Sequence, residues 1–253
     1  MSSSNHDRPF QFRLWHLLLA MSLFGLFLAV TVPIWRDARR AVQRLHCGSN
    51  LHQIQAALHN YHDRWKTLPP VAWTDSNGKP MHSWRVLVAP LLDSGGAVKG
   101  YDFSEPWDGP TNRRFHAVDA ELWRCPSNRT KLGRTSYVAI YGPGTAWNIN
   151  RPTSFDEMTD GISSTLLIVE IRNSDIHWME PRDISIANLK LQVNAKDDPC
   201  IGSYHLGGAM VAFADGRVEQ LDEKETAERI KAMLTIAGGE ELEDDAGSGS
   251  VTE

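Results

Sequence analysis

The chain has 253 residues, enough for one domain or two small ones with a substantial hydrophobic core. Apolar residues make up 42% of it and charged residues 23%, which excludes a largely disordered protein. The 26 Lys and Arg against 31 Asp and Glu give a formal charge of −5, which argues against nucleic acid as a partner. The three cysteines exclude a small scaffold held by many disulfides.

The first predicted element is an apolar segment, residues 14–35, that contains no Asp, Glu, Lys or Arg. At ~1.5 Å per residue, a helix of this length spans the ~30 Å hydrocarbon core of a bilayer. A cleaved secretory signal is the alternative, but the run is too long for its apolar region and no small-x-small site ends it. We therefore predict an uncleaved transmembrane helix in the lipid bilayer, preceded by a polar tail, residues 1–13.

Basic residues flank this segment on both sides. Arg8 and Arg13 precede it, and residues 36–44 hold four more arginines. Taken alone, the positive-inside rule would place the C-terminal side of the segment in the cytoplasm.

The same helix is predicted to continue beyond the membrane. Apolar residues recur there at spacings of three and four, which gives the helix one apolar face. They are Ala41, Leu45, Leu51, Ile54, Leu58, Tyr61, Trp65 and Leu68. Gly48-Ser49 predicts a bend, and Pro69-Pro70 predicts the end of the helix.

Residues 71–134 are rich in Gly, Pro, Asn and Asp, which indicates long loops. Within them the run HSWRVLVAPLLD, residues 82–93, predicts one short helix. β-Branched and aromatic residues at 135–142 and 164–171 then predict two strands.

Residues 208–221 predict the clearest hairpin. Side chains alternate along its first strand, and Asp215-Gly216 predicts a tight type I′ turn. Residues 223–236 predict a short amphipathic helix, and the acidic, glycine-rich tail 238–253 is expected to be disordered.

One long helix, a loop-rich middle and antiparallel strands predict an α+β fold. The long helix would lie half in the membrane and half packed on a small antiparallel sheet with long loops. This is a type IV pilin-like layout.

Several ordered blocks carry a resemblance to a known family. CGSNLHQIQAALHNYHDRWKTLPP occupies residues 47–70, and further blocks follow at 105–112, 123–128 and 135–147. Near the C-terminus, His205 is followed by nine residues and then by Asp215-Gly216. The chain resembles a bacterial pilin-like family with a prepilin-type N-terminus and a C-terminal H-x9-DG motif, also catalogued as a domain of unknown function and as bacterial extracellular solute-binding protein family 10.

The resemblance implies a protein of the bacterial inner (cytoplasmic) membrane with a cytoplasmic N-terminus. Residues 36–237 would form an extracytoplasmic pilin-like domain. This contradicts the arginine count, and we follow the resemblance because the charge bias is weak when basic residues flank both ends.

The N-terminus departs from the prepilin pattern at two positions. That pattern has glycine before the cleaved bond and glutamate four residues after the following phenylalanine. Aligned on Phe12, these positions hold Gln11 and His16. The departures imply that prepilin peptidase does not cut the chain, and losing a costly carboxylate from lipid together with its function is physically consistent.

Cys47 and Cys125 match two cysteines that recur in the family, whereas Cys200 is additional. In an oxidising compartment Cys47 and Cys125 could form a disulfide, worth ~3–5 kcal/mol by the loop-entropy model. Two buried free thiols are the alternative. No C-x-x-C occurs, so the sequence does not support a thioredoxin-like or zinc-ribbon role.

Histidines gather on the predicted long helix, at positions 46, 52, 59 and 62. A metal site completed by His205 and Asp215 is one interpretation. No H-E-x-x-H or similar ligand spacing occurs, so we favour polar residues at the edge of a packed helix and expect no metal ion.

His205, Asp215 and Gly216 are expected to be structural. The intervening extended chain would separate His205 from Asp215 by ~30 Å, and Asp-Gly suits a turn. His205 would bond backbone at the glycine-rich entry to the hairpin. A hydrolase triad with Ser203 is rejected because no G-x-S-x-G occurs.

The predicted soluble part is rich in tryptophan, which more often fixes loops than binds ligands. These residues are Trp73, Trp84, Trp107, Trp123, Trp147 and Trp178. We therefore expect no enzyme and no cofactor, but a membrane-anchored pilin-like protein related to pseudopilins, interacting with other pilin-like or secretion-system proteins. A membrane-tethered solute-binding domain is the alternative.

Overall fold

The computed structural model describes residues 14–92, 98–117, 121–128, 132–149 and 151–239. The chain divides into two compact units, residues 1–42 and 43–253. The predicted N-terminal tail, and the predicted C-terminal tail from residue 240 onward, lie outside the described residues.

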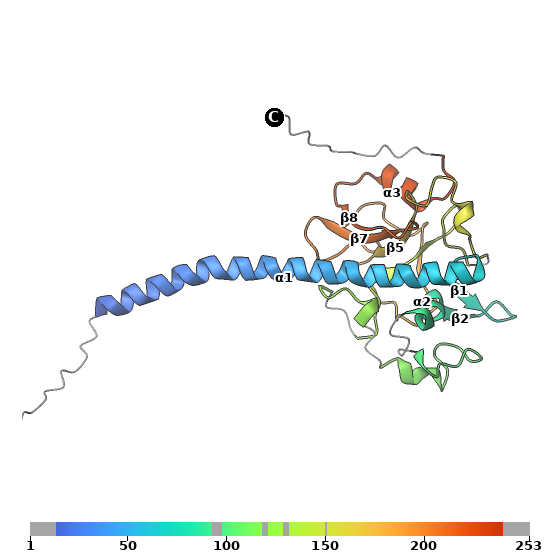
Figure 1. Cartoon of the computed structure of the whole chain (residues 1–253), viewed down its shortest axis with the longest axis horizontal. Helices are drawn as coiled ribbons and strands as arrows, with labels where there is room; N and C mark the ends of the chain where they lie inside the picture. Colours follow the sequence, from blue (N-terminus) through green and yellow to red (C-terminus); the bar gives the residue numbers. More distant parts are fainter. Residues whose placement is uncertain (1–13, 93–97, 118–120, 129–131, 150, 240–253) are drawn as a thin grey trace, which may run out of the picture. The chain divides into compact units, whose positions relative to one another are not determined.

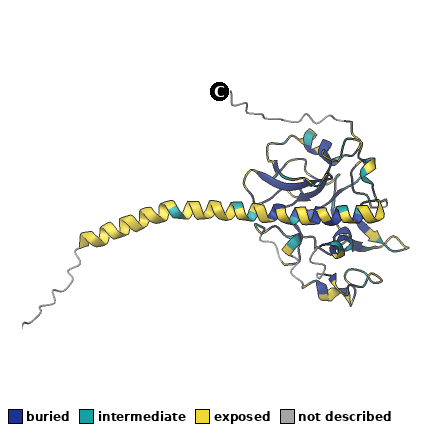
Figure 2. Ribbon diagram, in the orientation of Figure 1, coloured by how far each residue is buried: buried dark blue, intermediate teal, exposed yellow. Residues whose placement is uncertain are grey.

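Helix α1, Leu14–Trp65, contains the predicted membrane segment (Figure 1). Its most apolar stretch has a mean hydropathy of 2.4, and none of that stretch is buried by protein (Figure 2). Leu18, Phe24 and Phe27 are each more than half exposed. The helix is long and apolar enough to cross a membrane, and hydrocarbon is the environment in which such uncovered side chains are stable.

From Gln43 onward, α1 buries one face against the second unit. Leu51, Ile54, Leu58 and Tyr61 of the predicted apolar face are buried. The prediction that Leu45 and Trp65 also belong to this buried face is wrong, because they are 71% and 46% exposed. Gly48 lets the helix approach the side chain of Met210 closely, because a Cβ on Gly48 would lie 3.4 Å from Met210 Cε.

The predicted bend at Gly48-Ser49 does not interrupt α1, which runs through both residues as one helix. Its end at Trp65 comes four residues before Pro69-Pro70. Lys66 follows with a left-handed φ of +62° and stops the helix there.

A four-stranded antiparallel sheet forms the centre of the second unit. Its strands, in spatial order, are β3 (Tyr137–Val138), β5 (Leu166–Glu170), β7 (Gly208–Phe213) and β8 (Val218–Asp222). Two smaller ribbons accompany it: antiparallel β1 (Ala72–Thr74) with β2 (Pro80–Ser83), and parallel β4 (Ile140–Tyr141) with β6 (Ile184–Ser185). Within the described residues, the helices after α1 are α2 (Trp84–Val88), α3 (Ala227–Leu234) and the 3₁₀ turns η1 (Ala89–Leu91), η3 (Asn112–Phe115), η4 (Glu121–Trp123) and η5 (Phe155–Glu157).

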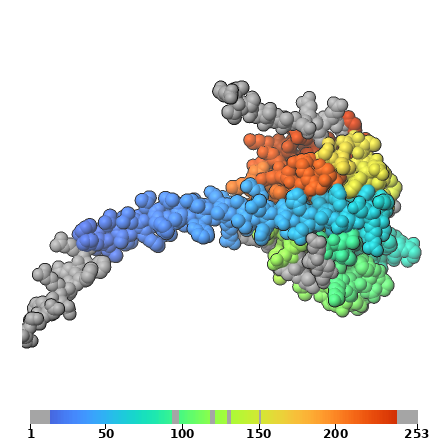
Figure 3. Space-filling model, in the orientation of Figure 1, coloured from blue at the N-terminus to red at the C-terminus, as the bar shows by residue number. Residues whose placement is uncertain are grey.

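The central sheet is covered on both faces, which explains why every residue of β7 is buried. Met210 and Ala212 belong to the core cluster that contains the buried face of α1. Val211 and Phe213 belong to a second cluster with α3. The predicted alternation along the first strand of the hairpin thus places successive side chains in two different cores. Figure 3 shows α1 from residue 43 at the surface, between the orange hairpin region and the green loop region.

The hairpin between β7 and β8 is confirmed, but the predicted turn type is wrong. A type I′ turn needs positive φ at both Asp215 and Gly216, and only Gly216 has it, at +92°. The Phe213 N–H donates to the Arg217 carbonyl over 2.9 Å, and the Gly216 N–H donates to the Phe213 carbonyl over 3.0 Å. The loop is therefore one residue longer than predicted and ends in a left-handed glycine.

The predicted strand 135–142 is divided into β3 and β4. Ala139 lies between them, and its N–H donates to Asp183 Oδ1 over 2.7 Å instead of joining a ladder. Asp183 also forms a fully buried ion pair with Arg85 of α2, at 2.6 Å. Two guanidinium nitrogens of Arg85 donate to the Tyr137 carbonyl at 3.0 and 3.1 Å, so this pair joins the loop region to the sheet.

The substitution Asp183→Ala is expected to lower the free energy of unfolding by about 3–5 kcal/mol, because it leaves the Arg85 guanidinium buried without a counter-charge. Denaturant unfolding of the full chain in detergent measures this. Asp175→Ala is the matched control, since its ion pair with Arg182 is largely exposed and is worth ~0–1 kcal/mol. Equal decreases in the free energy of unfolding in the two variants would contradict a special stabilising role for the buried ion pair.

His177 is held uncharged inside a stack of aromatic rings. Its ring centroid lies 5.5 Å from Trp107 and 4.7 Å from His116. The Met179 N–H donates to Nδ1 over 3.2 Å. Burial lowers the pKa of His177 from its ordinary 6.5 to about 4.

We expect this shift to make the fold less stable in mild acid. As the pH falls from about 6.5 to about 4, the unfolded chain takes up a proton at His177 that the folded chain does not, so the free energy of unfolding decreases. His177→Gln should show a shallower decrease than the wild type in melting curves over this range. Parallel pH profiles in the two proteins would refute the role of His177.

Candidate functional site

The structure places His205 and Asp215-Gly216 at opposite ends of β7. Six residues of extended strand separate the two ends by about 20 Å. At the far end, Asp215 Oδ1 accepts the Arg217 N–H, and a Cβ on Gly216 would lie 3.8 Å from His59 Nε2. Asp215 and Gly216 are therefore turn residues, separate from the surroundings of His205.

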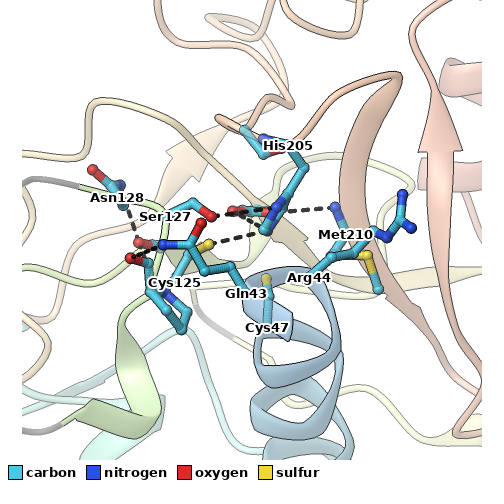
Figure 4. A network of polar contacts seen from close by, with 12 residues as sticks. Gln43, Arg44, Cys47, Cys125, Ser127, Asn128, His205 and Met210 are labelled. Atoms are coloured by element: carbon cyan, nitrogen blue, oxygen red, sulfur yellow. Dashed lines mark hydrogen bonds and ion pairs between the residues drawn. The ribbon is translucent and has the colours of Figure 1, made fainter. Parts of the chain in front are cut away.

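His205 instead joins a buried cluster of four side chains that sequence spacing does not predict. Cys47 comes from α1, Cys125 from the loop after η4, Glu170 from the end of β5 and His205 from the loop before β7. One donor atom of each lies within 4.8 Å of the donor atoms of the others, and all four residues are buried. Figure 4 shows Cys47 on the helix, with Cys125 and His205 converging beside it.

The backbone before β7 is shaped to deliver His205 to this cluster. Ser203 Oγ accepts the His205 N–H over 2.9 Å and donates to the Gly208 carbonyl over 2.8 Å, which closes a tight loop. Gly207 and Gly208 have φ of +85° and +155°. A Cβ on Gly208 would lie 1.9 Å from the Leu221 carbonyl oxygen, so only glycine fits there.

Hydrogen bonds fix the orientation of each donor atom. His205 Nε2 lies 3.2 Å from Cys125 Sγ and 3.9 Å from Glu170 Oε1, and its Nδ1 lies 3.4 Å from Ser127 Oγ. The Tyr137 hydroxyl donates to Cys47 Sγ over 3.2 Å. The Met210 N–H donates to Glu170 Oε2 over 3.0 Å, which leaves Oε1 facing His205.

The cluster shifts the proton affinities of its members in opposite directions. The hydrogen bond between the two thiols, together with burial, raises the pKa of Cys47. The same hydrogen bond, assisted by His205, lowers the pKa of Cys125. Burial raises the pKa of Glu170 well above its usual range, and it raises the pKa of Tyr137 too.

The sequence left open whether Cys47 and Cys125 form a disulfide or remain two buried thiols, and the structure brings them together as free, buried thiols. Cys200 is also a free, buried thiol, but it lies elsewhere, 3.8 Å from the Ala195 carbonyl oxygen. The ring of His205 contacts side chains and not the expected backbone groups. Two thiols, an imidazole and a carboxylate form a donor set suited to thiol chemistry or to a soft metal ion.

The histidines of α1 do not converge with this cluster in the described part of the chain. His46 and His52 are exposed. The Phe155 N–H donates to His62 Nε2 over 3.3 Å, and Ser154 Oγ lies 3.4 Å from the same atom. His62 thus binds the start of η5, as expected of a polar residue at the edge of a packed helix.

Glu170 is the member of the cluster that sequence reasoning missed. It is the last residue of a strand whose five residues are all buried. A carboxylate at the end of the apolar run LLIVE is the signal that could have identified it, because an acidic residue is rarely buried without a partner.

A separate groove of about 660 Å³ follows the exposed side of α1 within the second unit. Its lining includes Gly48, His52, Ala56, Leu92, Met210 and Gln220. This mixture of apolar and polar side chains suits a small ligand.

Comparison with known proteins finds a family match for part of the chain. Residues 36–149 match the family model SBP_bac_10, described as a protein of unknown function (DUF1559). The matched region contains Cys47 and Cys125, while Glu170 and His205 lie beyond it. No curated protein matches the chain, and no solved structure matches it.

Proposed function

We propose that this protein is a non-enzymatic, single-pass membrane protein that acts in interaction or scaffolding at the bacterial cell envelope. The observation that carries the proposal is α1, a single helix whose first part is long and apolar enough to cross a membrane and whose last part packs into an α+β unit. This is the construction of pilin-like proteins, which the sequence resembles.

The proposed orientation has the N-terminus in the cytoplasm and the second unit outside. Basic residues on both sides of residues 14–35 make the positive-inside rule a weak guide, so we base the proposed orientation on the pilin-like organisation. An extracytoplasmic unit would meet other envelope proteins directly, which agrees with an interaction role.

The hydrogen bonds of Ser203 support a non-enzymatic role. Its hydroxyl donates to the Gly208 carbonyl and accepts the His205 N–H, so both contacts hold the loop. A serine nucleophile needs its hydroxyl aimed at an imidazole nitrogen. The imidazole of His205 faces Cys125 and Ser127 instead.

We further propose that the chain is not processed by prepilin peptidase, because Gln11 and His16 occupy the positions of the required glycine and glutamate. Without cleavage no new amine forms at Phe12, and without glutamate that amine would have no partner. The protein would then keep its anchor outside the pilus assembly pathway.

In-cell cross-linking of native membranes, followed by mass spectrometry, tests both parts of the proposal. We expect an intact Gln11-Phe12 bond and cross-links to pilin-like or secretion-system proteins. The matched control is the double variant Gln11→Gly, His16→Glu, which restores the pattern and should be cut when a prepilin peptidase is present. A wild-type chain that begins at Phe12 would contradict the absence of processing, and an intact chain with no protein cross-links would contradict the scaffolding role.

The groove along α1 favours a second candidate function, a membrane-tethered solute-binding domain. Its volume of about 660 Å³ is within the range of small-molecule sites, and its lining offers amide groups as well as apolar surface. In that case the second unit would present a solute to the membrane surface without a two-lobed closure.

Filling the groove should distinguish this candidate. Ala56 is exposed and lines the groove, so Ala56→Trp is expected to reduce binding of a neutral sugar by at least about tenfold, or ~1.4 kcal/mol. Calorimetric titration of the full chain in detergent with mono- and disaccharides measures this. Ala187→Trp, at an exposed position outside the groove lining, is the control, and sugar binding that survives both substitutions would place the ligand elsewhere.

A further inference from the structure

We propose that Cys47, Cys125, Glu170 and His205 bind one zinc ion, which joins four separate segments of the second unit. The inference rests on the convergence of these side chains and depends neither on the membrane anchor nor on the groove.

The geometry of the four donors fits a single ion. In tetrahedral coordination, ligand atoms 2.0–2.3 Å from zinc lie roughly 3.3–3.8 Å from one another. His205 Nε2 lies 3.2 Å from Cys125 Sγ and 3.9 Å from Glu170 Oε1, and all four donor atoms lie within 4.8 Å of one another. Changes of up to about 1 Å in the separations of the donor atoms would complete the site.

The chemistry of the donors selects the metal. Two sulfurs exclude calcium and magnesium, which take oxygen ligands, and two cysteines with one histidine and one carboxylate suit zinc. All four ligands come from the protein and all are buried, so the site has no open position for a substrate. It would be a structural zinc site.

The burial of Glu170 supports a cation at this place. Its side chain accepts the Met210 N–H and lies beside the two thiols and the His205 imidazole, and none of these carries a permanent positive charge. A carboxylate in a hydrophobic interior is costly unless a cation or several hydrogen bonds compensate it. A divalent ion would provide that compensation for the carboxylate and for the thiolates together.

The surrounding hydrogen bonds hold the ligands in the orientation that coordination needs. Ser127 Oγ lies beside Nδ1 of His205, which directs Nε2 toward the cysteines. The Tyr137 hydroxyl donates to Cys47 Sγ, and the Met210 amide occupies the carboxylate oxygen that faces away from His205. Partners of this kind orient and tune the ligands of metal sites.

The same two thiols could instead form a disulfide, and the two outcomes exclude each other. Exchange with an external disulfide would join Cys47 Sγ to Cys125 Sγ and pass two protons and two electrons to that disulfide, which becomes two thiols, leaving no thiolate for a metal. Zinc would keep both sulfurs reduced. The number of free thiols therefore separates the two chemistries.

The first measurement is the zinc content and thiol count of the full chain, purified in detergent without reductant. We expect one zinc per chain and alkylation of all three cysteines after denaturation with a chelator. Before denaturation, adding chelator should increase the alkylation of Cys47 and Cys125 much more than that of Cys200. A protein with one alkylated cysteine and no zinc would overturn the proposal in favour of the disulfide.

Cobalt substitution tests the ligand set. Cobalt-loaded wild type should show a sulfur-to-metal charge-transfer band and the intense visible bands of a tetrahedral site. Cys125→Ser and His205→Gln should weaken these bands and lower zinc affinity at least tenfold, whereas Cys200→Ser, which removes a buried thiol outside the cluster, should leave both unchanged.

Because a ligand variant could fail to fold, the melting temperature of the wild type provides an independent test. It should rise with zinc concentration in the wild type and in Cys200→Ser. A wild type that contains three free thiols but shows neither zinc-dependent melting nor a charge-transfer band would refute the site.

Discussion

The buried ion pair between Arg85 and Asp183 is the interaction on which the second unit depends. A sheet whose edge strand β3 has two residues cannot by itself order the long loops around it. Asp183 binds the Ala139 amide between β3 and β4, and Arg85 binds the carbonyl of Tyr137. The side chain of that same tyrosine donates to Cys47, so one residue links the ion pair to the proposed zinc site. The Arg85 guanidinium therefore holds β3 through the Tyr137 carbonyl, and Cys47 Sγ holds it through the Tyr137 hydroxyl.

How far the sequence predicts this structure depends on the range of each interaction. The apolar patterns of α1 and β7 can be read locally, because side chains on one face recur every three to four residues in a helix and every two in a strand. The structure contains both elements. The turn at Asp215-Gly216 was placed correctly but given the wrong type, since dipeptide preference does not determine loop length. Leu45 has the spacing of a core residue and is exposed, because helical periodicity does not reveal how far along the helix the covering domain extends.

The four-residue cluster shows the limit of sequence reasoning most clearly. Cys125 and His205 are 80 residues apart, and neither has a second ligand at the short spacing typical of zinc motifs. Only the packing of α1, β5 and two loops brings the donors together, and that packing is tertiary information. The resemblance identified the cysteines as a pair, but Glu170 became visible only when its burial at the end of β5 was known.

The spacing between His205 and Asp215-Gly216 has a physical explanation in this arrangement. The intervening residues are a glycine-rich entry, the six residues of β7 and the first residue of the turn. One end of the strand must deliver an imidazole to the buried cluster, and the other must place a left-handed glycine at the turn. Inserting one residue into β7 would reverse which side chains face α1 and α3, because the side-chain period of a strand is two. Strand register therefore couples the proposed metal site to both hydrophobic cores, so the histidine and the turn need not touch for their spacing to matter.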